Sequence, residues 1–186
     1  MLFNLSSLVH YLGDHQATRE YSQQALSIAW EIGSRRTQGY ALTSLGHALA
    51  GLGQLAEAGE FYQQALTLRH ELGQHHLAME DWAGLARISI AQGNSTQAQA
   101  YVEEILSYLQ DHTLDGTEEP FQIYLTCYHV LNAHHDPRAQ IVLKTAYHLL
   151  QEQAAKITSE EMRRSFLENV AAHREIVEEY IRRESA

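Results

Sequence analysis

One stretch of eleven residues occurs twice in this chain, and the spacing of the two copies limits the folds that are open to it. "QQALSIAWEIG" covers residues 23–33 and "QQALTLRHELG" covers residues 63–73. Six of the eleven positions are identical, and three more exchange Ser for Thr or Ile for Leu. Self-similarity at a fixed spacing is the sequence signature of repeat architectures. The chain is therefore predicted to be built from tandem repeats of about forty residues.

A second set of matches indicates where each repeat turns. Gly13, Gly53 and Gly93 lie forty residues apart, and each precedes a polar residue and a new run with helical periodicity. A glycine that closes one helix and a polar residue that caps the next are typical of two helices joined by a tight turn. The repeating unit is predicted to be a pair of helices.

The best-preserved copy, "LTSLGHALAGLGQLAEAGEFYQQAL" at residues 42–66, resembles the tetratricopeptide repeat. It places Gly46, Ala58, Tyr62 and Ala65 where that family has small or aromatic residues, and the next copy has the favoured tryptophan at Trp82. Short side chains at helix crossings let the helices approach to ~8–10 Å. The resemblance implies an all-α fold, a right-handed α-α superhelix of tetratricopeptide-like helical hairpins with a C-terminal capping helix.

The register of the repeats predicts one tetratricopeptide-like domain over residues 1–186. Its repeats lie at about 1–34, 35–74, 75–114 and 117–156, and a capping helix lies at 158–184. The capping helix begins at a capping-box pattern and has one apolar face, and we expect that face to cover the last repeat. The residues of this face are Met162, Phe166, Val170, Val177 and Ile181. At the other end of the array, Leu2, Leu5 and Leu8 are expected to face solvent.

The spacing of forty exceeds the ~34 residues of the basic tetratricopeptide repeat, which predicts lengthened helices. Such lengthened repeats resemble the arms of bacterial signal-transduction ATPases and of maltose-regulator-like transcriptional regulators. That resemblance implies a role in signalling or transcription regulation.

Composition limits the partners and the compartment. The net charge is −10, so the chain offers no basic field for direct nucleic-acid binding. No apolar run reaches the ~18 residues of a membrane span, and the start has no basic region or cleavage site of a secretory signal. A single cysteine, Cys127, suits a reducing compartment. A cytoplasmic location without membrane contact is predicted.

Motifs for chemistry are absent from the sequence. It contains no phosphate-binding loop and no nucleophile elbow. The 12 histidines lack the spacing of zinc ligands, and the adjacent pairs His75-His76 and His134-His135 fall in expected turns. We therefore expect no catalytic residue, no metal site and no cofactor.

The resemblance also implies where a partner binds. First helices of the family line an inner, concave wall, and the residues carried over to that wall are His10, Tyr40, Thr43, His47, Glu80, Arg87, Tyr124 and Tyr128. Tyrosines suit such a surface because they combine a large rigid ring with a hydroxyl. An equally weighted alternative for Tyr124 and Tyr128 is packing against the C-terminal helix.

Together these observations predict a non-catalytic protein-protein interaction module that holds a protein or peptide in its concave groove. Two alternatives stay open. The wall could enclose a metabolite, as in a small-molecule-sensing regulatory domain. The uncovered N-terminal hairpin could instead make the chain a self-assembling scaffold or homo-oligomer.

Overall fold

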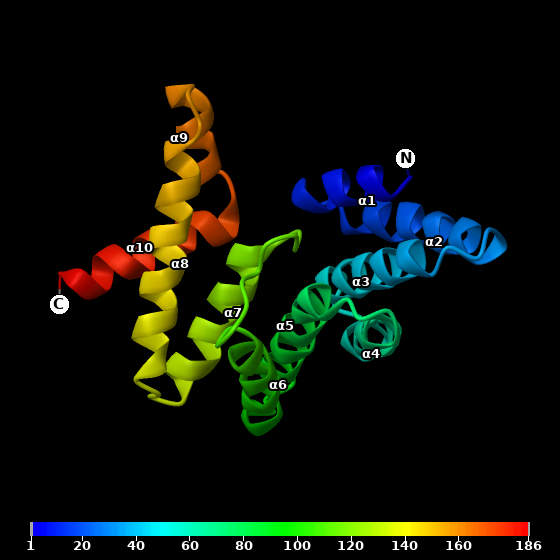
Figure 1. Ribbon diagram of the computed structural model, residues 1–186, viewed down its shortest axis with the longest axis horizontal. Coiled ribbons are helices and arrows are strands. Elements are labelled where there is room, and N and C mark those ends of the chain that lie inside the picture. Colours follow the sequence, from blue (N-terminus) through cyan, green and yellow to red (C-terminus); the bar gives the residue numbers. More distant parts are fainter. Residues whose placement is uncertain (1, 186) are drawn as a thin grey trace. The chain divides into compact units, whose positions relative to one another are not determined.

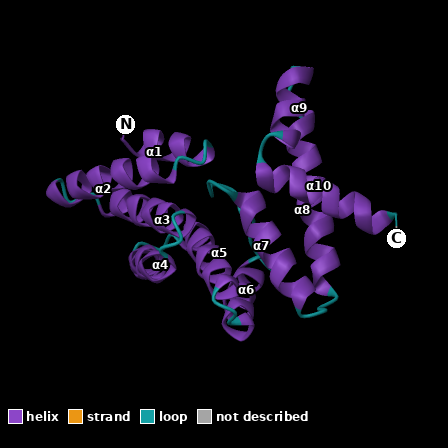
Figure 2. Cartoon of the chain, turned by 180° about the vertical axis from the view of Figure 1, so that it is seen from behind, coloured by secondary structure: helices purple, strands orange, loops and turns teal. Residues whose placement is uncertain are grey.

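Every regular element that the computed structural model describes is a helix, and Figures 1 and 2 show helices joined by loops. The description covers residues 2–185, with side chains from residue 5 onward, so the prediction for the Leu2 side chain lies outside it. The helices are α1 (Leu2–Tyr11), α2 (His15–Glu31), α3 (Arg35–Gly51), α4 (Leu55–Glu71), α5 (His75–Ala91), α6 (Ser95–Tyr108), α7 (Pro120–Ala133), α8 (Arg138–Ala155), α9 (Glu160–Glu168) and α10 (Ala171–Glu184). The predicted all-α fold is confirmed.

The chain forms two compact units, Met1–Glu118 and Glu119–Ala186. The first unit contains α1 to α6, and the second contains α7 to α10. The prediction of a single domain over residues 1–186 stays a prediction.

The duplicated segment that defines the repeat ends in the same turn both times. Gly33 and Gly73 have φ values of 68° and 66°, a left-handed conformation that suits glycine. The amide of Gly33 donates to the Trp30 carbonyl, and the next amide, of Ser34, donates to Ala29 at 2.9 Å. This pair of bonds is a Schellman motif, and it satisfies carbonyls that the end of a helix leaves unpaired. Helices α2 to α5 contain 17 residues each, as the spacing of forty predicts.

The fourth hairpin makes the same turn without a glycine. His135 has a φ of 55° and donates its amide to the Asn132 carbonyl at 3.1 Å, while the Asp136 amide donates to Leu131 at 2.9 Å. A histidine in this conformation is less favourable than a glycine because its Cβ crowds the backbone. The hydrogen bonds of the turn therefore hold a strained residue in place.

Consecutive helices of the first unit pack against one another. The first helix of each hairpin also contacts the first helix of the next hairpin. α1 contacts α3 and α3 contacts α5, whereas the second helices α2, α4 and α6 do not contact one another in the described part of this unit. The first helices therefore form the inner, more crowded row. We refer to the surface of α1, α3 and α5 on this row as the first-helix wall.

Tyr62 of α4 sets how closely α3 and α5 approach. Its side chain is fully buried, and its ring lies against the backbones of Gly46 in α3 and Gly84 in α5. A Cβ at Gly46 would lie 2.5 Å from the ring, and a Cβ at Gly84 would lie 2.4 Å from it. Only glycine leaves room for the ring, so the small residue noted at Gly46 is a packing position.

The C-terminal part of the second unit differs from the predicted single capping helix over residues 158–184. Two helices, α9 and α10, are present instead, and the helical conformation is interrupted between them at Asn169 and Val170. The His173 Nδ1 donates to the Phe166 carbonyl across the break at 2.8 Å. The prediction of a single helix is therefore wrong.

The break also changes which residues are buried. α10 packs on α7 and α8, and its Ile176 is fully buried, whereas Met162 and Ile181 of the predicted face are 66% and 55% exposed. A break shifts the helical phase, so one apolar stripe cannot continue through it.

Candidate partner-binding wall

The first-helix wall contains three of the predicted partner contacts in one cluster. The rings of His10 in α1 and His47 in α3 are stacked, with centroids 5.1 Å apart and planes 19° apart. The Nδ1 of His47 lies 2.7 Å from the Tyr62 hydroxyl and 3.5 Å from Nη2 of Arg87. His10, His47 and Arg87 are half-buried. The wall thus presents two rings and a guanidinium that neighbouring side chains hold in defined orientations.

A buried charge cluster supports the wall from behind. The Nε of Arg69 in α4 lies 2.8 Å from Oδ2 of Asp81 in α5, and both side chains are fully buried. Thr43 of α3 accepts from Arg69 Nη2 at 2.8 Å and donates to Asp81 Oδ1 at 2.8 Å. The guanidinium carbon of Arg69 lies 5.2 Å from the centre of the Tyr40 ring, a cation–π contact. The ion pair joins α4 to α5, and the Thr43 hydroxyl joins α3 to both through hydrogen bonds.

Burial changes the acid–base behaviour of both carboxylates near Arg69. Burial raises the pKa of Asp81 to about 7, although Arg69 and Thr43 oppose the change. Burial likewise raises the pKa of Glu80 to about 8, with Arg69 again opposing it and the Glu118 carboxylate adding to it. A single buried cation cannot compensate fully for two carboxylates that have left water.

Glu80 is predicted to face the partner, but it is covered in this structure. Its side chain is 3% exposed, and its carboxylate accepts a hydrogen bond from the backbone amide of Glu118. Thr43 is also buried, because its hydroxyl serves the charge cluster. Of the predicted wall residues in the first unit, His10, Tyr40, His47 and Arg87 keep partial exposure.

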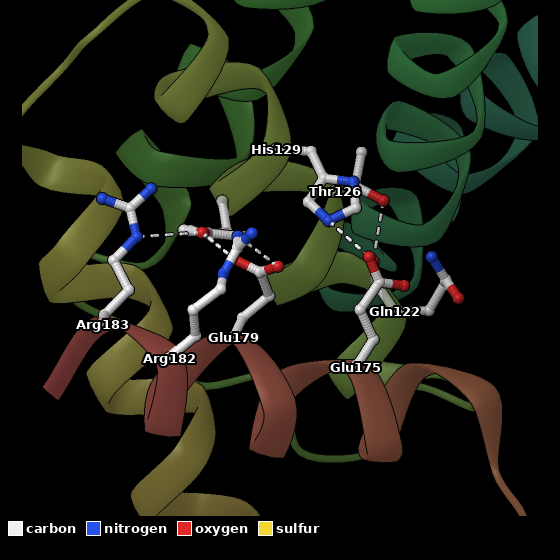
Figure 3. Close-up of polar contacts among 8 residues, drawn as sticks. Gln122, Thr126, His129, Glu175, Glu179, Arg182 and Arg183 are labelled. Carbon is white, nitrogen blue, oxygen red and sulfur yellow. Dashed lines mark hydrogen bonds and ion pairs between the residues drawn. The ribbon is translucent and has the colours of Figure 1, made fainter. Parts of the chain in front are cut away.

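Tyr124 and Tyr128 lie on α7 of the second unit, and both are buried. The Tyr128 hydroxyl donates to Glu179 of α10 at 2.5 Å, and the Arg183 Nε donates to that hydroxyl at 3.3 Å. His129 of α7 makes an ion-pair contact of 2.9 Å with Glu175 of α10 (Figure 3). α10 therefore covers this part of α7, which corrects the placement of Tyr128 on an open wall and favours the alternative of packing against the C-terminal helix.

Sequence reasoning missed Arg69 and Asp81, although the duplicated segment contains a signal for one of them. Arg69 stands forty residues after Ala29, and both positions are fully buried. An arginine at a buried alanine position requires an anion nearby. Which carboxylate supplies it depends on the contact between α4 and α5.

Comparisons with known proteins agree with this arrangement of hairpins. The tetratricopeptide repeat family matches residues 40–72, which span most of α3 and all of α4. The prediction of tetratricopeptide repeats is confirmed. A search of curated protein sequences finds no match.

Three solved structures illustrate the similarity in fold. BtubC (BKLC) from P. vanneervenii superposes with a TM-score of 0.64 at 20% identity, covering 97% of this chain and 73% of that one. The apo form of RapI has a TM-score of 0.64 at 14% identity, covering 96% and 65%. A putative kinesin light chain with nearly identical tetratricopeptide-like repeats, from Podosopora anserina, has a TM-score of 0.61 at 16% identity, covering 99% and 89%. At these identities the similarity concerns the fold.

None of the helices that the structure describes has the length and apolar character needed to cross a membrane.

Proposed function

We propose that this protein is a non-catalytic protein-protein interaction module and that the first-helix wall contacts the partner. The observation that carries the proposal is the row of half-buried side chains from successive first helices, namely His10, Tyr40, His47 and Arg87. Tetratricopeptide repeats generally serve as scaffolds for protein partners. Aromatic rings and arginines are the residues most often found at the energetic centres of such interfaces.

Rigid support of the wall favours binding. The Tyr62 hydroxyl holds His47, and the buried ion pair of Arg69 and Asp81 lies beneath the Tyr40 side of the wall. Side chains that are already ordered lose less conformational entropy when a partner arrives.

Site-specific photocrosslinking tests the proposal. A benzophenone side chain at Tyr40 should capture a defined protein in cells, whereas the same group at the exposed Gln64 of α4 should not. Arg87→Glu should reduce the adduct at Tyr40 because it reverses the charge of the wall. The proposal fails if both positions give the same adducts, or if Arg87→Glu leaves the yield of the Tyr40 adduct unchanged.

We further propose that the module serves bacterial signalling or transcription regulation in the cytoplasm. The long 17-residue helices, which resemble those of regulator arms, support this assignment. Deletion of the coding sequence should change a defined set of transcripts, and Arg87→Glu should reproduce that change. Unaltered transcripts would contradict the regulatory role but would not affect the proposal of an interaction module.

A second candidate function is self-association through the N-terminal hairpin. Leu8 in α1 and Leu12 directly after it are 55% and 75% exposed, and Leu5 is also exposed on the same helix. Sedimentation equilibrium over a wide concentration range should then show a dimer or larger species that Leu8→Glu dissociates. A monomer at every concentration would exclude this candidate.

A further inference from the structure

The segment that follows α6 in the first unit, residues 109–118, is longer than the turns of the earlier hairpins. Three residues connect α2 to α3 and α4 to α5, whereas α6 ends at Tyr108 and α7 begins only at Pro120. α6 also ends before residue 114, the predicted limit of its repeat. Helix–helix connections commonly have ~2–8 residues, so this one is longer than usual. We call residues 109–118 the strap.

The strap holds a defined turn over one buried side chain. Leu114 is 4% exposed, although its neighbours Thr113 and Asp115 are exposed. The amide of Thr117 donates to the Leu114 carbonyl at 3.1 Å, and its hydroxyl donates to the same oxygen at 2.7 Å. Gly116 has a φ of 87°, as the third position of a type II turn requires. The strap is therefore an ordered segment with an aliphatic anchor.

The glycine of this turn lies against the first-helix wall. A Cβ on Gly116 would stand 3.5 Å from Cδ2 of His76, in the first turn of α5. That distance is an ordinary van der Waals contact, so the positive φ of the turn is what favours glycine here.

The end of the strap is bound through main-chain groups. The Glu118 amide donates to the Glu80 carboxylate on α5, and the Tyr11 hydroxyl on α1 donates to the Glu118 carbonyl at 3.1 Å. The Ser7 hydroxyl reaches the Glu118 side chain at 3.4 Å. α1 and α5 are the two first helices that contact α3 in this unit. The strap therefore contacts both α1 and α5, and the two helices hold its end through main-chain groups next to the turn at Gly116.

We propose that the first-helix wall takes a short peptide that forms the same turn as the strap, and that the strap occupies this place until such a peptide displaces it. The required features are an aliphatic residue, a glycine two positions later, and a backbone amide and carbonyl for Glu80 and Tyr11. This inference rests on the proposed interaction function and names its ligand class and its built-in competitor.

The balance of contacts explains why the strap can be replaced. Main-chain groups of another peptide with the same turn can reproduce its bonds to Glu80 and Tyr11, because neither bond depends on a side chain of the strap. Leu114 is the buried apolar anchor among residues 111–118, and the side chains of Thr113, Asp115 and Glu118 are exposed. A partner with a similar anchor and further contacts to the half-buried rings of the wall would therefore compete successfully.

A labelled synthetic peptide, DHTLDGTEE, with the sequence of residues 111–119, tests the inference in trans. Leu114→Ser removes the buried anchor of the strap and should free the wall. Fluorescence anisotropy should then show that the peptide binds this variant at least about tenfold more tightly than the wild type. The reason is that the strap covers the wall in most wild-type molecules, which lowers the apparent affinity of the peptide. Leu52→Ser, in the exposed turn after α3, is the matched control and should behave as the wild type does. Adding Tyr11→Phe to Leu114→Ser should weaken the binding again.

Equal affinity of the peptide for all variants, or no binding to the Leu114→Ser chain, would overturn the inference. Hydrogen exchange provides a second measurement that needs no substitution. The Glu118 amide of the wild-type chain should be protected, and exchange at the rate of an unstructured peptide would also overturn it. If a partner crosslinks at Tyr40 but the peptide does not bind, the inference that the strap competes for the wall is wrong, and the proposed interaction function still stands.

Discussion

Replacing Gly84 by alanine should destabilise the first unit by about 2 kcal/mol, although alanine is the better helix former. The added methyl would lie 2.4 Å from Cζ and 2.7 Å from Cε1 and Cε2 of Tyr62. The ring has little room to retreat, because it also lies against the backbone of Gly46 and its hydroxyl is bonded to His47. Overpacking of a closed site costs ~1–3 kcal/mol, with this site at the upper end, and helix propensity returns ~1 kcal/mol.

The matched control is Gly59→Ala in α4, where the nearest atom to the new methyl is Leu85 Cδ2 at 4.0 Å. It should stabilise the unit by up to about 1 kcal/mol. Both tryptophans, Trp30 and Trp82, belong to the first unit, so urea unfolding followed by tryptophan fluorescence reports on this unit alone.

A double variant isolates the contact responsible. Tyr62→Leu with Gly84→Ala should cost less than the sum of the two single changes, because the smaller side chain relieves the overlap. If Gly84→Ala stabilises the unit as Gly59→Ala does, the close approach of α3 and α5 around Tyr62 is wrong.

Three further predictions concern buried charge, pH and a strained turn. Arg69→Met should cost about 3–5 kcal/mol in urea unfolding because it leaves Asp81 buried without its cation, and adding Asp81→Leu should recover most of the loss. The pKa of Glu80 is about 8 in the folded chain against 4.5 for the free side chain, so between these values only the folded chain holds the proton. Glu80 should therefore make the free energy of unfolding fall as pH rises, by at most about 1.4 kcal/mol per pH unit in addition to any contribution from Asp81, and Glu80→Gln should lack this component between pH 5 and 7.5. His135→Gly should raise the thermal stability of the second unit by up to about 1 kcal/mol, because glycine adopts the φ of 55° without strain, and a lower melting temperature would contradict this reading.

Much of the fold could be predicted because its signals are local. The turn at Gly33 needs a left-handed residue and two hydrogen bonds within six residues of chain, and the same composition recurs forty residues later at Gly73. Helix pairing follows from such short turns, since two helices joined by three residues lie side by side. The first-helix positions of His10, His47 and Arg87 followed from the same register.

Several features of the site depended on contacts between residues far apart in the chain. Glu80 has the register of an open wall residue, but a strap 38 positions later covers it. Tyr128 has the same kind of register, but Glu179 of α10, 51 positions later, binds its hydroxyl. No local pattern predicts where a loop or a final helix will come to rest.

The sequence by itself determined that this protein is an array of long helical hairpins, because backbone hydrogen bonding and the spacing of glycine and small residues act over a few positions. Only the tertiary structure decided which wall residues are open, which carboxylates share the cation of Arg69, and that the strap lies on α1 and α5. Those outcomes depend on side chains that meet only when separate helices pack, and burial then changes both their exposure and their pKa values.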